Sequence, residues 1–366
     1  MFVREHGSNG IGQFCGINVC FKAGFWVALI AVFSFSNFAV ASEIDSFTRR
    51  FEPLENSAPV INAKVNEFIA GAIERANSVG RGCDEDTLYD EIKKDLDILL
   101  FRGPLILYLV DSPGVAKHTL AREESIYKYF RMDDGFLLVF PLVDALGVGM
   151  GVTFNFNGVY VGSDKFEHIF GPGNTYFDSV YRKKEDLATV LYNGMIEEYI
   201  FRGGCTTGVY SYADLFAGFT GMRFWNHILQ QYPDILGEDI GPYVQCQANR
   251  WVPVKDIDLG FYINPGFDEG YNCSSLMTTD GLNGVKKALA ELNAQHGTDR
   301  YKCPLDADVI DQLYAKYRIP LVSNNAYTVA DFIFNPARII NKYNKYWTSI
   351  LYFLMRLNGS SATYYY

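Results

Sequence analysis

Charged residues are scarce in this chain, at 20% of 366 residues, and no block of Lys or Arg occurs anywhere in it. The 32 basic and 42 acidic side chains leave a formal net charge of −10, so nucleic acid is not an expected partner. With 49% apolar residues, the composition also excludes disorder, collagen and coiled coil. A chain of this size can bury a sizeable core as one large domain or two smaller ones.

Several catalytic motifs are absent as well. The sequence contains no Gly-x-Ser-x-Gly nucleophile motif, no phosphate-binding Gly-rich loop, no His-Glu-x-x-His and no Rossmann fingerprint. It has no Cys-x-x-Cys pair and no Cys/His spacing typical of a zinc ribbon. Because these motifs are absent, the sequence does not indicate a particular reaction, and the substrate class stays open.

A targeting segment lies near the N-terminus. Residues 23–41, AGFWVALIAVFSFSNFAVA, follow Lys22 and end in Ala-Val-Ala, a small-x-small pattern. Because the apolar core is too short for a spanning helix, we predict a signal peptide over residues 1–41, cleaved after Ala41. The mature protein is then periplasmic or secreted and keeps no stable transmembrane anchor. An uncleaved membrane anchor is the alternative, since the segment before Lys22 is long for a signal peptide.

Five cysteines remain after this cleavage. An oxidising compartment permits disulfides. The last three cysteines lie in a loop-rich region, residues 243–303, where a disulfide would cross-link segments without regular secondary structure. The odd number leaves at least one thiol unpaired. We interpret all of them as structural. They are Cys83, Cys205, Cys246, Cys273 and Cys303.

Two further apolar stretches are too short to span a membrane. Residues 136–150 contain both a Pro and an Asp, which favours a buried core element. Residues 346–357 are only about half a span long. We predict a terminal helix docked on the core there, with membrane contact as the alternative.

Apolar periodicity predicts helices over most of the mature chain. They cover residues 57–78, 84–100, 184–201, 211–231 and 281–294, whereas the apolar run 104–110 cannot be assigned from its pattern.

One β-hairpin interrupts this helical pattern. Residues 153–162 alternate around Asn157-Gly158, a pair that tolerates the positive φ angles of a type I′ turn. A helix beginning with DKFEHIF follows, with Ser163 as its expected N-cap. We therefore predict a mainly α fold with a small β-component (α+β), organised as a single domain over residues 42–366.

Polar residues on three consecutive helices form the candidate site. Asp164 and His168 are four residues apart, which puts both side chains on one helix face. The next helix carries Glu198, beside Glu197, and the one after opens close to Asp214. This inventory suits an acid–base pair or a divalent metal site. We predict Asp164, His168, Glu198 and Asp214 as catalytic residues, and His168, Asp164 and Glu198 as ligands if a metal is bound.

Structural roles are the alternative for each of these residues. Asp164 would favour the positive end of its helix, and Asp214 would complete a capping box with Ser211. Lys165 would pair with a nearby carboxylate, and His168 would be a hydrogen-bonded core residue.

The order of these residues is similar to that of VanZ-like and YfiM-like bacterial envelope proteins. Those families show Asp-Lys-x-x-His-Phe, a helical Glu, and Asp-x-x-x-Asn-x-x-Gly. The stretch 159–225 also resembles a group of secreted proteobacterial proteins of unknown function. The resemblance implies a location in the bacterial envelope but no established reaction. The matching residues are Asp164, Lys165, His168, Glu198 (or Glu197), Asp214, Gly218 and Gly221.

Two departures from this pattern stand out. VanZ-like proteins are polytopic membrane proteins, whereas this chain has no expected spanning helix after its signal peptide. Gly218 stands where those families have Asn, which removes one hydrogen-bonding side chain from the site.

A second polar group follows a Gly/Pro turn, in the segment Asp268-Glu269-Gly270-Tyr271-Asn272. Loops held by a scaffold often carry binding groups, so we predict Lys165, Asp268, Glu269 and Asn272 as substrate-binding residues. The alternative is that Asp268 and Asn272 hydrogen-bond their own backbone and shape the turn.

Two functions follow from these observations. The first is an exported bacterial envelope hydrolase, metal-dependent or acid–base, acting on an envelope component or a small molecule. The second is a non-catalytic periplasmic binding or structural protein, in which the same residues form a buried polar network.

Overall fold

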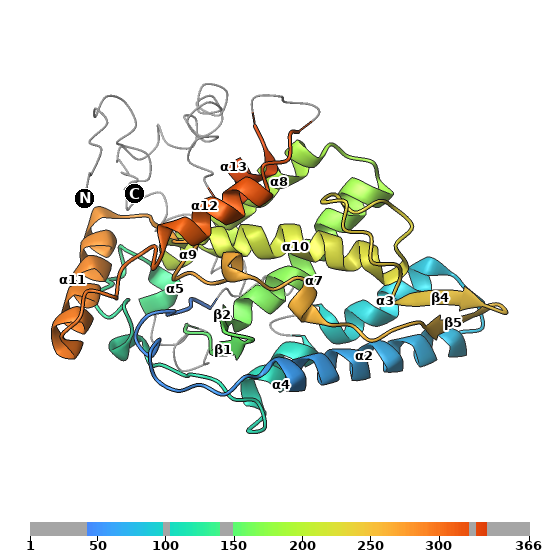
Figure 1. The fold of residues 1–366 in the computed structure, drawn as a ribbon, viewed down its shortest axis with the longest axis horizontal. Helices are drawn as coiled ribbons and strands as arrows, with labels where there is room; N and C mark the ends of the chain where they lie inside the picture. The colour runs from blue at the N-terminus through green and yellow to red at the C-terminus, as the bar shows by residue number, and fades with distance from the viewer. Residues whose placement is uncertain (1–41, 98–102, 140–148, 322–326, 335–366) are drawn as a thin grey trace.

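The computed structural model describes residues 42–97, 103–139, 149–321 and 327–334 (Figure 1). The predicted signal peptide, the predicted terminal helix at 346–357 and most of the predicted core element at 136–150 lie outside these residues. Helices dominate, and the only strands in the described ranges form short antiparallel pairs. The prediction of a mainly α fold with a small β-component is confirmed.

Two helices form the centre of the fold. α7 (Ser163–Phe177) crosses α10 (Tyr212–Leu229), and the two make the most extensive contact between elements (Figure 1). Every residue of α10 is buried. The crossing is close because small residues face each other: a Cβ on Gly221 would lie 2.1 Å from the Ile169 carbonyl oxygen. Gly221 is thus required by backbone packing.

The predicted β-hairpin precedes α7 directly. β1 (Thr153–Phe156) pairs antiparallel with β2 (Val159–Gly162). Asn157 and Gly158 both have positive φ, 52° and 91°, as the tight turn requires. Because β2 continues into α7 without a linker, the hairpin holds the N-terminal end of that helix.

Three N-terminal helices cover one side of the central pair. α2 (Ala58–Ser78) matches its predicted range, whereas α3 (Glu85–Leu96) ends before the predicted 84–100 does, because Asp97 is extended. α4 (Pro104–Asp111) occupies the run that the pattern left unassigned. α3 begins after Asp84, whose side chain accepts a hydrogen bond from Thr87 N at 2.9 Å. The buried faces of these helices join the main apolar core.

The predicted helix at 184–201 is divided in two. α8 (Leu187–Glu197) continues into a wider π-helical turn, Glu198–Arg202, and Gly203 ends it. The short helix α9 (Gly204–Thr207) follows. β3 (Val209–Tyr210) then pairs with β6 (Ser275–Leu276) and leads into α10.

The remaining elements surround this centre. The β4–β5 hairpin lies at one end of the molecule and α11 at the other (Figure 1). α11 packs beside a smaller apolar cluster that includes Phe130, Ala288 and Leu292. The bounds are α5 (Phe136–Val139), β4 (Val244–Gln247), β5 (Arg250–Pro253), α11 (Thr279–His296), α12 (Ala307–Lys316) and α13 (Val329–Ile333), with short helical turns at Arg122–Glu124, Asp178–Arg182, Leu259–Phe261 and Pro265–Phe267.

Two disulfides link distant parts of the chain. Cys83, just before α3, bonds to Cys246 on β4, and Cys273 bonds to Cys303. Cys205 belongs to neither bridge. Both bridges reach into the loop-rich region, as the sequence predicts. Among the helices of the described ranges, none combines the length and the apolar character needed to cross a membrane.

Candidate functional site

The first two turns of α7 carry three of the predicted site residues. Asp164, Lys165 and His168 are all buried there. Gly162, in extended conformation, is the N-cap residue, so the expectation that Ser163 caps this helix is wrong. A Cβ on Gly162 would lie 2.3 Å from Asp164 Oδ1. The end of the hairpin therefore needs glycine so that the carboxylate can turn back over its own backbone.

Lys165 lies at the centre of a group of carboxylates. Its Nζ donates to Asp164 Oδ2 at 2.6 Å and to Glu269 Oε1 at 2.7 Å, and it also contacts Asp214 Oδ1. Burial alone would lower the pKa of Lys165, but these three carboxylates raise it well above its usual value. The ammonium is therefore charged at neutral pH. Although Ser211 Oγ lies 3.3 Å away, a charged lysine cannot act as its base.

Asp214 connects this group to a second one. The ligand atoms of Asp164, Asp214 and Glu269 lie within 4.8 Å of one another, around the Lys165 ammonium. The ligand atoms of His168, Glu198 and Asp214 meet the same limit. His168 Nε2 is 3.3 Å from Asp214 Oδ2, the oxygen that does not face Lys165. The structure thus groups His168 and Glu198 with Asp214, and Asp164 with Lys165.

Glu198 has one satisfied and one unsatisfied oxygen. Ser211 N donates to Glu198 Oε1 at 3.2 Å, whereas Oε2 is buried without a hydrogen-bond partner. Burial, and then the nearby Asp214, raise the pKa of Glu198 well above its usual value. Gly203 leaves the space for this side chain, since its Cβ would lie 2.3 Å from Oε1. Glu197, the alternative to Glu198 in the sequence, is half-buried. Its Oε2 lies 3.6 Å from Arg202 Nη2, in an ion pair outside the cluster.

Electrostatics set the charge of the remaining two groups. Burial lowers the pKa of His168 to about 4, and the attraction of Asp214 only partly opposes this effect. The imidazole is therefore neutral at neutral pH, the form that binds metals. Burial alone would raise the pKa of Asp214, but His168 and the Lys165 ammonium lower it below its usual value.

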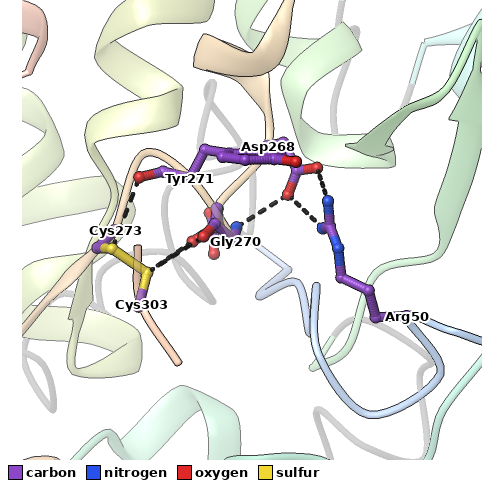
Figure 2. The surroundings of a disulfide bond; sticks show 7 residues. Arg50, Asp268, Gly270, Tyr271, Cys273 and Cys303 are labelled. Carbon is purple, nitrogen blue, oxygen red and sulfur yellow. Dashed lines mark hydrogen bonds and ion pairs between the residues drawn. A yellow bond between two sulfur atoms is a disulfide. The ribbon is translucent and has the colours of Figure 1, made fainter. Parts of the chain in front are cut away.

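The predicted substrate-binding loop is split between two environments. Glu269 enters the cluster, where Ser211 Oγ also donates to it at 2.8 Å. Asp268 points elsewhere and forms a two-pronged ion pair with Arg50, both distances being 2.7 Å (Figure 2). The Asn272 amide donates to two backbone carbonyl oxygens, those of Gly266 and Ile333. Asp268 Oδ1 also accepts a hydrogen bond from Gly270 N at 2.8 Å, so Asp268 and Asn272 both hold the loop.

The structure adds to this cluster a buried acid that the sequence analysis did not single out. Glu43 accepts a hydrogen bond from Thr207 Oγ1 and is buried. Burial, and then the charge of Glu269, raise the pKa of Glu43 well above its usual value. Glu43 belongs to no local motif, and only its proximity to the predicted cleavage position distinguishes it in the sequence. Such a residue is found only from the folded arrangement.

The whole cluster carries an excess of negative groups. Against the single ammonium of Lys165 stand five buried carboxyl groups, those of Glu43, Asp164, Glu198, Asp214 and Glu269. Buried carboxylates are costly unless they bind protons, cations or metals. A neutral imidazole with two carboxylates is a ligand set that zinc and similar divalent cations accept. The arrangement can therefore hold either protons or one cation.

A separate polar network lies at the other end of α10. Arg223 Nε donates to Asp234 Oδ2 at 2.8 Å, and His227 Nε2 lies 3.1 Å from the same oxygen. His227 Nδ1 is 2.7 Å from the Tyr262 hydroxyl. All four residues are buried. The network ties the C-terminal half of α10 to the loops that follow it.

Comparison with known proteins adds no relative to this description. No protein-family model, no curated protein and no solved structure matches the chain. The similarity to VanZ-like and YfiM-like proteins therefore stays a prediction, and the function is argued from the site itself.

Proposed function

We propose that this protein is an exported envelope hydrolase that binds one divalent cation through His168, Glu198 and Asp214. The observation that carries this proposal is Glu198 Oε2, a buried acceptor without a hydrogen-bond partner. The ligand atoms of Glu198, the neutral His168 imidazole and the Asp214 carboxylate lie within 4.8 Å of one another. Buried polar atoms are nearly always satisfied, and a cation bound there would satisfy this one.

The position of Lys165 supports a single cation. The other group of three carboxylates already surrounds the Lys165 ammonium, which leaves no reason for a metal there. Asp214 uses Oδ1 for this ammonium and Oδ2 for the side of His168. Lys165 is therefore proposed as a fixed internal cation that orients Asp214, in place of the predicted role in substrate binding.

The chemistry of such a site is water activation. A divalent cation held by His168, Glu198 and Asp214 would lower the pKa of a bound water toward neutrality and so supply a nucleophile. Three protein ligands leave a coordination position for this water. Hydrolysis of an envelope component or a small molecule is the reaction class that fits. Asp164 then acts indirectly, because it holds Lys165 and not the cation.

Export is supported by two independent features of the chain. The described residues contain two disulfides, which persist in oxidising compartments and are rare in the cytosol. The N-terminal segment has the apolar core and small-x-small end of a signal peptide. The resemblance of residues 159–225 to bacterial envelope proteins agrees with both.

A non-catalytic role is the second candidate, and the burial of the cluster favours it. Its most exposed members, His168 and Asp214, are only 7% and 6% accessible. In this case the residues form a closed polar network that joins α7, the π-helical turn after α8, and α10, and protons balance the excess carboxylates. Removing one member would then cost stability in the absence of any metal.

Metal content decides between these two functions. We would purify the exported protein without chelator and measure bound metals, alongside His168→Ala, Glu198→Gln and the exposed control His296→Ala. The proposal expects about one divalent cation per chain in the wild type and in the control, and none in the two site variants. It also expects chelator to lower the melting temperatures of the wild type and the control, and to leave those of the two site variants unchanged.

The opposite result supports the network. No metal in the wild type, together with a large loss of stability for His168→Ala and an unchanged melting temperature in chelator, would overturn the hydrolase proposal.

A further inference from the structure

The Cys273–Cys303 disulfide lies against the loop that carries Glu269. The Cys303 sulfur is 3.2 Å from the Glu269 carbonyl oxygen and 3.6 Å from that of Gly270 (Figure 2). Leu305 N donates to Gly270 O at 2.8 Å. The bridge therefore joins two segments at the point where Glu269 enters the buried cluster.

The segment that contains Cys303 is itself held in place by hydrogen bonds to α11. Asn293, on α11, accepts a hydrogen bond from Tyr301 N and donates one to Tyr301 O, each at 2.9 Å. Cys303 lies two residues beyond Tyr301 in the sequence. Because α11 is a long helix packed on its own apolar cluster, the disulfide ties the Glu269 loop to a fixed element.

Glu269 in turn is connected to two of the three proposed ligands. Its Oε1 accepts from Lys165 Nζ at 2.7 Å and from Ser211 Oγ at 2.8 Å. Lys165 contacts Asp214 Oδ1, and Ser211 N holds Glu198 Oε1 at 3.2 Å. A shift of Glu269 would therefore disturb the orientation of both Asp214 and Glu198.

The position of Glu269 is electrostatically unfavourable for a negatively charged side chain. Burial raises its pKa, and so does the negative charge of Asp214, although Lys165 opposes both effects. Its hydrogen bonds to Lys165 and Ser211 persist only while the backbone of the loop is held in place. The Arg50–Asp268 ion pair provides one restraint on the loop, and the disulfide provides a covalent one.

We propose that the Cys273–Cys303 disulfide is a positioning element for Glu269, and that cation binding at His168, Glu198 and Asp214 depends on its oxidation. The site would then be complete only in an oxidising compartment, after export. This inference rests on the proposed function. It also has a part that stands without metal, namely that the bridge orders the Glu269 loop.

The bridge is accessible to thiol reagents. Cys303 is exposed and Cys273 is half-buried. A thiolate of a dithiol reductant attacks one sulfur, the S–S bond breaks, and a mixed disulfide forms. The second thiol of the reductant then displaces the protein sulfur. Cys273 and Cys303 take up two electrons and two protons as free thiols, and the reductant becomes a disulfide.

The chain offers a matched control in its other disulfide. Cys83–Cys246 also has one exposed and one half-buried cysteine, but it joins the start of α3 to β4. We would compare wild type, Cys273→Ser/Cys303→Ser and Cys83→Ser/Cys246→Ser as full-length proteins purified after export. Two quantities are measured at 25 °C: hydrogen exchange of the amides of residues 268–272 without metal, and Kd for Zn²⁺.

The expected result separates the two pairs. Loss of Cys273–Cys303 should raise exchange at residues 268–272 at least about tenfold and weaken Zn²⁺ binding about 10–100-fold, the effect typical of lost supporting contacts. Loss of Cys83–Cys246 should leave both quantities within about twofold. Treatment of the wild type with dithiothreitol should reproduce the first result, and reoxidation should reverse it.

Other outcomes overturn one proposal at a time. Unchanged exchange and unchanged Kd in the Cys273→Ser/Cys303→Ser variant would overturn the redox inference, and so would equal effects of the two pairs. If the oxidised wild type binds no Zn²⁺ but exchange responds to the bridge as expected, the cation site is wrong while the positioning of the Glu269 loop holds.

Discussion

Asp214 meets the Lys165 ammonium with Oδ1 and leaves Oδ2 3.3 Å from His168 Nε2. One carboxylate thereby belongs to both groups of buried polar residues. Asp164 contacts the same ammonium at 2.6 Å but is absent from the group that contains His168 and Glu198. The two aspartates of the Asp-Lys-x-x-His helix and of α10 therefore have different roles.

Asparagine substitutions should separate these roles. We expect Asp214→Asn to lower the free energy of unfolding by about 3–5 kcal/mol, because Lys165 loses a buried partner and the cluster loses its shared member. Asp164→Asn also removes one partner of Lys165 but leaves the group of His168, Glu198 and Asp214 intact, so it should cost less. Urea unfolding at pH 7 measures both changes, with the exposed Asp133→Asn as the control.

The same pair of variants tests the ligand set. Asp214→Asn should lose the bound cation, whereas Asp164→Asn should keep it. A larger loss of stability in Asp164→Asn, or loss of metal in that variant alone, would contradict this assignment. It would favour the ligand set predicted from the sequence, which is His168, Asp164 and Glu198.

Removal of the internal cation should be strongly destabilising. Lys165→Met leaves Asp164, Asp214 and Glu269 buried together without their shared ammonium. We expect a loss of about 3–5 kcal/mol at pH 7, because uncompensated buried charge is costly. Added Mn²⁺ should restore part of this stability by occupying the vacated position. Thermal and urea unfolding with and without Mn²⁺ measure the effect.

The exposed Lys302→Met variant is the control for this experiment. Its stability should equal that of the wild type, and it should respond to Mn²⁺ only as the wild type does. Equal stability of Lys165→Met and wild type would show that the ammonium does not balance the carboxylates.

Acid unfolding should involve the network at the far end of α10. Burial alone would raise the pKa of Asp234, but contacts with His227 and Arg223 lower it to about 2. Because the folded pKa is below the unfolded value of about 3.9, Asp234 stabilises the fold above pH 4, and this contribution is lost as the pH falls toward 2. The pKa difference corresponds to about 2.6 kcal/mol, of which about 2 kcal/mol is lost by pH 2.

A pH series of urea unfolding checks this expectation. The stability difference between wild type and Asp234→Asn should shrink by about 2 kcal/mol between pH 5 and pH 2. The exposed Asp256→Asn variant should show no such change. A difference that stays constant over this range would mean that Asp234 is not held in its charged form.

The close crossing of α7 and α10 should not tolerate a methyl group. In Gly221→Ala the new Cβ would lie 2.1 Å from the Ile169 carbonyl oxygen, and backbone atoms cannot move aside locally. We expect a loss of at least about 3 kcal/mol, at the upper end of the cost of overpacking. Gly114→Ala is the control, because its nearest atom outside the adjacent residues would be 3.6 Å away.

Melting temperatures of the two variants measure the difference. A Gly221→Ala protein as stable as Gly114→Ala would mean that the helices can separate, and that the cluster between them is less rigid than its geometry indicates.

Local patterns in the sequence determined the elements of this fold. The pair Asn157-Gly158 specifies the hairpin turn because both residues accept positive φ. Apolar spacing located α2, α3, α10 and α11 to within a few residues, since a helix must bury one face. The four-residue spacing of Asp164 and His168 likewise placed them on one side of α7.

Only the tertiary structure decided which polar residues meet. Glu269 lies 104 positions from Lys165 yet contacts it, whereas Asp268 and Asn272, its neighbours in sequence, turn toward Arg50 and backbone carbonyls. Nothing in the local pattern marks Glu43. Periodicity encodes which face of an element is buried, but long-range partners depend on how the elements pack. Here Gly221 allows α7 to approach α10 closely, and Asp214 of α10 lies next to Lys165 and His168 of α7.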